Sequence, residues 1–232
     1  NNEIFRQRDK SSNNDIGYFH QNIFEYFKGC EVPQAGWDVI YRNPDGITMP
    51  DGEVVHTLYV EMKNKHNTMN SASSAKTYIK MQSQILDDDD CACLLVEAIA
   101  KKSQNAKWTT KVDGENVQHR LIRRVSMDQF YAILTGEEDA FYQMCMVLPE
   151  VIDSVVNEDS SVKVPHDTVI QELRNVASLY DNQTEDLAMA MAVYMLGFNT
   201  YNGFKDGVQN ELGDIKENAL KRIYEYAKNF SR

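Results

Sequence analysis

The feature that most constrains the fold is a nearly continuous apolar segment at residues 92–100, ACLLVEAIA. Its length suits one strand, and an apolar run without alternation is typical of a strand that is covered on both faces and has parallel neighbours. Residues 74–86 precede it with helical spacing, and a parallel connection needs such a crossover helix. The segment therefore predicts an α/β core with a buried central strand.

A β-hairpin is predicted before this strand. Residues 37–42 and 54–63 are rich in β-branched and aromatic side chains, which favour strands. Two Pro-Asp-Gly triplets lie between them, at residues 44–46 and 50–52, and this combination of residues is a strong turn signal. We expect one hairpin that turns near residues 49–50.

The other elements are predicted from the same periodicities. Residues 15–28 have the spacing of an amphipathic helix, residues 117–125 have that of a strand, and helical spacing prevails from residue 126 onward. We therefore predict two domains: a core over residues 1–156, with a mixed central sheet flanked by helices, and an α-helical C-terminal lobe over residues 157–232. The helices predicted after the core strands span residues 127–134, 137–147, 165–179, 185–198 and 214–229.

Charge is distributed unevenly along the chain, which matters for the kind of ligand it can bind. The formal net charge of -11 argues against a polyanionic ligand, because contact with phosphates normally needs a basic surface. Residues 61–125, however, carry 11 basic and 8 acidic side chains, whereas residues 1–60 and 126–232 are both acidic. A nucleic acid is therefore expected to contact the middle third.

Neither a membrane segment nor a cysteine-based site is predicted. The apolar runs are too short to cross a bilayer, and the polar residues 1–14 lack a secretory pattern. The four cysteines contain no Cys-x-x-Cys pair, so we expect reduced, buried thiols rather than a zinc site or a disulfide framework. The protein is accordingly expected to be cytoplasmic.

The candidate for chemistry is the triplet Glu61-Met62-Lys63. An acid two residues before a lysine is weak evidence by itself, because 35 acids and 15 lysines in 232 residues give about 2 such triplets by chance. Its place on a predicted strand is more informative, since period-two alternation puts Glu61 and Lys63 on one face, about 7 Å apart. The alternative is an ordinary solvated Glu-Lys pair.

A metal-dependent nuclease needs a second carboxylate near Glu61, and hairpin geometry ranks three aspartates. With a turn near residues 49–50, Asp38 lies directly opposite Glu61, with Cβ atoms about 5 Å apart. Asp51 would lie about 30 Å away along an extended arm. Asp45 needs the turn to move to about residue 53, so Asp38 is favoured and Asp45 remains the alternative.

Two carboxylates at this separation repel each other by about 3 kcal/mol at an effective dielectric constant of about 20, and a divalent cation between them removes that cost. Oxygen ligands favour Mg²⁺, which commonly takes one or two carboxylates and keeps several waters. We predict Asp38, Glu61 and the Met62 carbonyl as metal ligands. The predicted catalytic residues are Asp38, Glu61 and Lys63, of which Lys63 would position the attacking water or neutralise developing charge.

Polar and basic side chains after the predicted catalytic strand are candidates for DNA contact. The loop at residues 64–74 supplies three of them, and the following helix supplies two that lie one turn apart. A locally capped loop and a solvated helix face are the alternatives. The candidate DNA-binding residues are Lys65, Asn67, Asn70, Lys76 and Lys80. A phosphate-binding rim is also predicted from Lys101, Lys102, Arg120, Arg123 and Arg124.

Four segments of the chain are familiar as a set: GWDVI at residues 36–40, YVEMKNKHNTMN at 59–70, KTY at 76–78 and IAKKSQ at 99–104. Together they resemble the Eco-forty-seven-II type of restriction endonuclease, over roughly residues 15–150. Related enzymes cut GGNCC or GGWCC. The resemblance implies the PD-(D/E)xK fold, Mg²⁺, double-stranded DNA as substrate and a cognate DNA methyltransferase that protects the host genome. It also assigns the family's acidic pair and lysine to Asp38, Glu61 and Lys63.

The function predicted from these features is that of a type II restriction endonuclease, which hydrolyses double-stranded DNA with a metal-activated water and leaves 5′-phosphate ends. A symmetric target would require a homodimer, because each active site cuts one strand. Two alternatives stay open. One is a repair or recombination nuclease of the same fold that recognises DNA structure, and the other is a non-catalytic DNA-binding module, which the acidic net charge favours.

Overall fold

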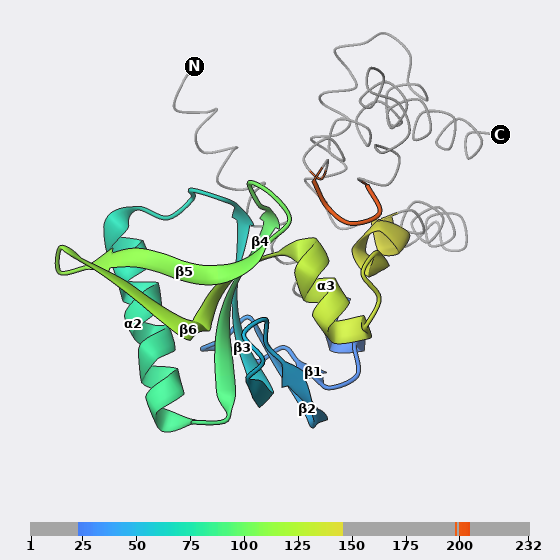
Figure 1. Cartoon of the computed structure of the whole chain (residues 1–232), viewed down its shortest axis with the longest axis horizontal. Coiled ribbons are helices and arrows are strands. Elements are labelled where there is room, and N and C mark those ends of the chain that lie inside the picture. The colour runs from blue at the N-terminus through green and yellow to red at the C-terminus, as the bar shows by residue number, and fades with distance from the viewer. Residues whose placement is uncertain (1–22, 146–197, 199, 205–232) are drawn as a thin grey trace, which may run out of the picture. The chain divides into compact units, whose positions relative to one another are not determined.

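The computed structural model describes residues 23–145, 198 and 200–204 (Figure 1). The chain divides into two compact units, which are residues 17–137 and, separately, residues 1–16 with 138–232. The strands described below all belong to the first of these units. In the second, residues 140–145 are helical, as predicted, and the Phe141 ring packs edge-on against Phe198 with 5.0 Å between the ring centroids.

Several predicted elements lie outside the described residues. These are most of the helix at residues 15–28, the division at residues 156 and 157, and the helices at residues 165–179, 185–198 and 214–229. Of the first helix, the described end forms a short 3-10 helix, η1 (Phe24–Tyr26). Within the described ranges, no helix is long and apolar enough to cross a membrane.

A mixed sheet with the strand order β1-β2-β3-β4-β6-β5 forms the centre of residues 17–137, as the sequence predicted. The strands are β1 (Cys30–Glu31), β2 (Val39–Thr48), β3 (Val54–Lys65), β4 (Cys91–Ile99), β5 (Asn105–Val112) and β6 (Glu115–Ser126). Strand β4 runs parallel to both β3 and β6, and the other neighbours are antiparallel. The fold is therefore a mixed α/β arrangement with β4 between two parallel partners.

The apolar run predicted as a central strand is β4, and its residues from Cys91 to Ala98 are all buried. Helix α2 (Ser71–Asp87) provides the crossover from β3, and helix α3 (Met127–Thr135) follows β6. Figure 1 shows α2 and α3 on opposite sides of the sheet. Under α2 the core consists of Trp37, Ile40, Tyr78, Met81, Cys93, Leu95, Trp108 and Ile122.

The predicted helix begins three residues earlier than expected, because Asn70 caps it. The Asn70 side-chain oxygen accepts a hydrogen bond from the Ser73 amide at 2.8 Å. This satisfies one of the amides that the first turn of a helix leaves without a partner. The cap positions the first turn of α2 directly after the loop that leaves β3.

The β2–β3 hairpin turns at its second Pro-Asp-Gly triplet, so the predicted turn at residues 49–50 is slightly wrong. At the tip, the Met49 amide donates to the Glu53 carbonyl at 2.7 Å. The first triplet instead lies in an irregular stretch of β2 between Arg42 and Ile47, where β2 holds three more residues than β3. Beyond this stretch Val39 pairs with Val60, which is the register that the sequence predicted.

Strand β5 was not predicted. Only Trp108 among its residues is buried, because β5 is an edge strand and half of its residues are exposed. Asp113 and Gly114 connect β5 to β6, with φ values of 49° and 86°. An Asp-Gly pair with two positive φ values is a favoured two-residue hairpin turn, and this pair was the signal in the sequence that could have identified the strand.

Gly29 stands where the backbone leaves no room for a side chain. Its φ is +82°, and an added Cβ would collide with the Arg42 carbonyl oxygen, whereas Gly114, at φ +86°, has open space around it. We predict that Gly114→Ala lowers the free energy of unfolding by about 1–2 kcal/mol, from its left-handed backbone alone, and that Gly29→Ala lowers it further. Urea unfolding measures both values. Equal losses would contradict a steric role for Gly29.

Candidate active site

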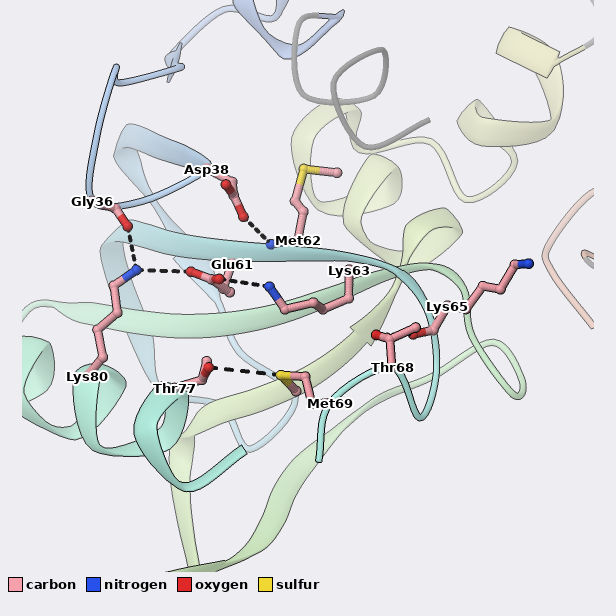
Figure 2. Close-up of polar contacts among 10 residues, drawn as sticks. All are labelled: Gly36, Asp38, Glu61, Met62, Lys63, Lys65, Thr68, Met69, Thr77 and Lys80. Atoms are coloured by element: carbon pink, nitrogen blue, oxygen red, sulfur yellow. Dashed lines mark hydrogen bonds and ion pairs between the residues drawn. The ribbon is translucent and has the colours of Figure 1, made fainter. Parts of the chain in front are cut away.

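The predicted catalytic residues Asp38, Glu61 and Lys63 lie together, and Lys80 joins them from a third element (Figure 2). Asp38 directly precedes β2, Glu61 and Lys63 lie on β3, and Lys80 lies on α2. The hairpin register places Asp38 opposite Glu61, since Val39 pairs with Val60 in the antiparallel ladder. Asp45 and Asp51 lie toward the other end of the hairpin, in the irregular stretch and at the tip, and both are exposed.

Asp38 extends the β2–β3 ladder by one step through its side chain. Its amide donates to the Val60 carbonyl at 3.0 Å, and its carboxylate Oδ2 accepts from the Met62 amide at 2.7 Å. Burial raises the pKa of Asp38 above its ordinary value, and the negative charge of Glu61 adds to this, while the Met62 amide acts in the opposite direction. Asp38 is thus held in place but is costly to ionise without a cation.

Glu61 is shared between two lysines, one at each oxygen. Lys63 Nζ lies 2.8 Å from Oε1, and Lys80 Nζ lies 2.9 Å from Oε2. Figure 2 shows the two ammonium groups approaching the carboxylate from opposite sides. Burial acts to raise the pKa of Glu61, yet the hydrogen bonds and charges of Lys63 and Lys80 together lower it. The two facing carboxyls therefore have pKa values shifted in opposite directions, a pattern found where two acids perform different tasks.

Lys80 was predicted as a DNA-binding residue, and the structure places it inside the carboxylate cluster. Besides Glu61, its ammonium donates to the Gly36 carbonyl and lies 3.9 Å from the centroid of the Trp37 ring. Such a position over an indole is favourable for a cation. Lys80 therefore connects α2 to the segment before β2. The sequence did not reveal that Lys80 belongs to the cluster.

The other candidates for DNA contact have varied surroundings. Lys65, Asn67 and Lys76 are exposed, and Asn67 adopts a left-handed φ of 61° in the turn after β3. Asn70 is the helix cap described above, so its side chain has the capping role that was the alternative to DNA contact.

The arginines of the predicted rim are held by internal partners. Arg120 Nε lies 2.5 Å from a Glu53 oxygen, and Arg123 is buried with its Nε donating to the Asn105 side chain at 2.6 Å. Arg124 forms an ion pair with Glu97 at 2.5 Å. Lys101 and Lys102 are exposed. The five residues therefore do not form one basic surface.

The opposite pKa shifts of Asp38 and Glu61 predict opposite effects on the stability of the metal-free protein. A carboxyl whose pKa is lowered by folding stabilises the protein above its unfolded pKa, about 4.3 for Glu, and this contribution is lost as the pH falls. A carboxyl whose pKa is raised by folding, such as that of Asp38, destabilises the folded protein at neutral pH. At pH 7 we predict that Glu61→Gln lowers the free energy of unfolding and that Asp38→Asn raises it, each by about 1 kcal/mol.

Urea unfolding in the presence of EDTA, at pH 7 and pH 3, measures these differences. Both should shrink at pH 3, because the carboxyls of the unfolded chain are then largely protonated and a shifted pKa in the folded chain contributes less to stability. Two changes of the same sign at pH 7, or differences that persist at pH 3, would contradict the assigned charge balance.

The chain matches the Eco47II restriction endonuclease family over residues 1–157. Among curated proteins it is 30% identical to the type II restriction enzyme Sau96I of Staphylococcus aureus, over 69% of this chain and 61% of that protein. It is 26% identical to the type II restriction enzyme Eco47II of Escherichia coli, over 68% of this chain and 66% of that protein. It thus spans less than two thirds of the length of either relative, and no solved structure matches it. The match covers more than half of the chain, including the Asp38, Glu61 and Lys63 cluster, and the chain therefore belongs to the Eco47II restriction endonuclease family.

Proposed function

We propose that this chain is a Mg²⁺-dependent type II restriction endonuclease with a PD-(D/E)xK active site. The observation that carries the proposal is the convergence of Asp38, Glu61 and Lys63 on one end of the hairpin, within the region that matches the family. The substrate is double-stranded DNA, and its target, proposed from the sequence resemblance, is GGNCC or GGWCC. Asp38, Glu61 and Lys63 are the proposed catalytic residues.

The proposed metal ligands are Asp38, Glu61 and the Met62 carbonyl. The backbone polar groups of Val60 and Met62 point toward β2. The Val60 carbonyl accepts a hydrogen bond from the Asp38 amide, and the Met62 amide donates one to the Asp38 carboxylate. The amide and carbonyl of one strand residue point to the same side, so the Met62 carbonyl lies on the Asp38 side of β3. Two carboxylates and one carbonyl form an oxygen donor set suited to Mg²⁺.

The raised pKa of Asp38 supports a cation at this place, because a divalent ion offsets the burial and the repulsion that disfavour its charge. No group of three His, Cys, Asp or Glu side chains suited to a metal occurs in the described ranges. Mg²⁺ commonly takes only one or two protein carboxylates and keeps several waters, so Asp38 and Glu61 are enough carboxylates for it. When bound, the ion would activate a water and stabilise charge on the scissile phosphate.

Glu61 is the residue that positions the other groups of the proposed site. Its lowered pKa keeps it ionised near neutral pH, so it can hold the Lys63 ammonium on the same face of β3. From there Lys63 positions the attacking water or neutralises the charge that develops on the phosphate. Lys80, fixed at Gly36 and Trp37, restricts the orientation of the Glu61 carboxylate.

The same proposal extends to the partners of the enzyme. The exposed Lys65, Asn67 and Lys76 are proposed to contact DNA next to the cluster, with Asn70 and Lys80 supporting the loop and the site from within. A two-fold symmetric target calls for a homodimer that brings one active site to each strand. A cognate methyltransferase would protect host DNA, and a cytoplasmic location follows from this substrate.

Digestion of unmethylated DNA from a fully sequenced phage, with the purified chain and Mg²⁺, tests the function. We expect discrete fragments whose 5′-phosphate ends map to one short sequence, because a restriction enzyme reads base edges as well as phosphates. Cuts restricted to branched or damaged DNA would instead identify a structure-specific nuclease. No Mg²⁺-dependent scission at any salt concentration would identify a non-catalytic DNA-binding module.

Substitution of the cluster tests the assigned roles. Lys63→Ala and Glu61→Ala should each lower the rate of plasmid cleavage by at least about 10²-fold, the usual loss when a group that stabilises transition-state charge is removed. Lys111→Ala, which changes an exposed lysine on β5, is the matched control and should cleave at the wild-type rate. Circular dichroism checks that each variant is folded. Retained cleavage by folded Lys63→Ala would refute the assignment.

A further inference from the structure

Glu97 is the charged residue of the apolar strand β4, and its surroundings are unusual. The residue is 2% exposed, and its Oε1 accepts from Arg124 Nη2 at 2.5 Å. Its other oxygen, Oε2, is buried and has no hydrogen-bond partner among the described residues. A buried oxygen of a charged group that lacks a partner destabilises a protein, so a structural ion pair alone accounts poorly for this arrangement.

The sheet places Glu97 beside the proposed active site. In the parallel β3–β4 ladder, Glu97 pairs with Lys63 and Leu95 pairs with Glu61. Paired residues of neighbouring strands project from the same face, and their backbones are about 4.8 Å apart. Leu95, two residues before Glu97, packs in the core under α2. Glu97 therefore shares the face of Glu61 and Lys63, one strand away.

Each oxygen of Glu61 already accepts a hydrogen bond from an ammonium group, so a divalent cation that binds Glu61 comes close to two positive charges and repels them. Lys80 is also held by Gly36 and Trp37. Within the described part of the chain, the ammonium of Lys63 has a hydrogen bond to Glu61 and to no other group. Lys63 is therefore the lysine that moves at the smaller cost, and Glu97 is the acid beside it.

We propose that Glu97 is a positioning residue, whose Oε2 receives the Lys63 ammonium when a divalent cation binds Glu61. Lys63 then stays charged and close to the metal-bound phosphate, and the buried Glu97 oxygen gains the partner it lacks. Arg124 holds the Glu97 carboxylate in place on its other side. This inference rests on the function proposed above. It adds Glu97, as a positioning residue, to the three proposed catalytic residues.

The test is a double-mutant cycle on metal binding in the full chain. Mn²⁺ alone is titrated into the protein, and the free ion is measured by electron paramagnetic resonance. Glu97→Gln should weaken Mn²⁺ binding about tenfold, as is usual for residues that support a metal ligand indirectly, because Lys63 then keeps competing for Glu61. In the Lys63→Gln background, the same Glu97→Gln change should leave Mn²⁺ binding unaltered, since the ammonium that moves to Glu97 is gone and Lys80 stays at Gly36 and Trp37.

A purely structural or long-range electrostatic role for Glu97 predicts the same change in Mn²⁺ affinity in both backgrounds, and that result would overturn the proposal. Glu53→Gln, which changes an acid paired with Arg120 on the hairpin, is the matched control and should bind Mn²⁺ like the wild type. If Glu97→Gln fails to fold, the pair Glu97→Gln with Arg124→Gln replaces it in the cycle, because removing both partners of a buried ion pair is often tolerated.

The cycle separates this inference from the proposed function. If the wild-type chain binds no Mn²⁺ and cleaves no DNA with Mg²⁺, the proposed function fails. If it binds and cleaves but the two backgrounds respond equally to Glu97→Gln, only the role of Glu97 fails. Under the proposal, Glu97→Gln should also lower kcat for Mg²⁺-dependent cleavage while leaving KM for DNA unchanged, because a residue that is buried is not expected to contact DNA.

Discussion

The register of β2 against β3 is the constraint on which the whole site depends. The turn at the second Pro-Asp-Gly triplet pairs Thr48 with Val54, and an unbroken ladder in that register would place Asp38 opposite Asn64. The three additional residues of β2 between Arg42 and Ile47 shift the register so that Val39 pairs with Val60, which brings Asp38 next to Glu61. Such irregularities are conserved devices for directing side chains in many sheets. Here the irregular stretch brings the two carboxyls together.

Charge balance around Glu61 follows from this register. The facing Asp38 and Glu61 are partly buried, and two lysines from different elements neutralise Glu61. One comes from the same strand and one from the crossover helix that covers it. Local alternation explains the first contact, whereas the second depends on how α2 docks on the sheet. The charge of Glu61 is thus balanced by the two lysines, whereas burial and the charge of Glu61 leave Asp38 hard to ionise.

Much of this could be predicted because strand and helix periodicities are local. The buried β4, the hairpin and the facing Asp38 and Glu61 follow from alternation, turn residues and counting along two arms. Strand β5 was not predicted, because an edge strand with exposed and charged side chains lacks the apolar pattern by which strands are recognised. The prediction of a phosphate-binding rim was wrong for another reason. Arg123 and Arg124 project from opposite faces of β6, and each contacts a different internal partner.

Sequence alone was sufficient to identify the Glu-Met-Lys strand, the family resemblance and the acid that faces Glu61, because each rests on spacing within a short segment. It could not place Lys80 in the cluster or show that Glu97 lies beside Lys63. Those positions were settled only when α2 packed on the sheet and β4 paired with β3 in a parallel register. Contacts between distant segments depend on packing and through-space charge, which no local pattern of residues encodes.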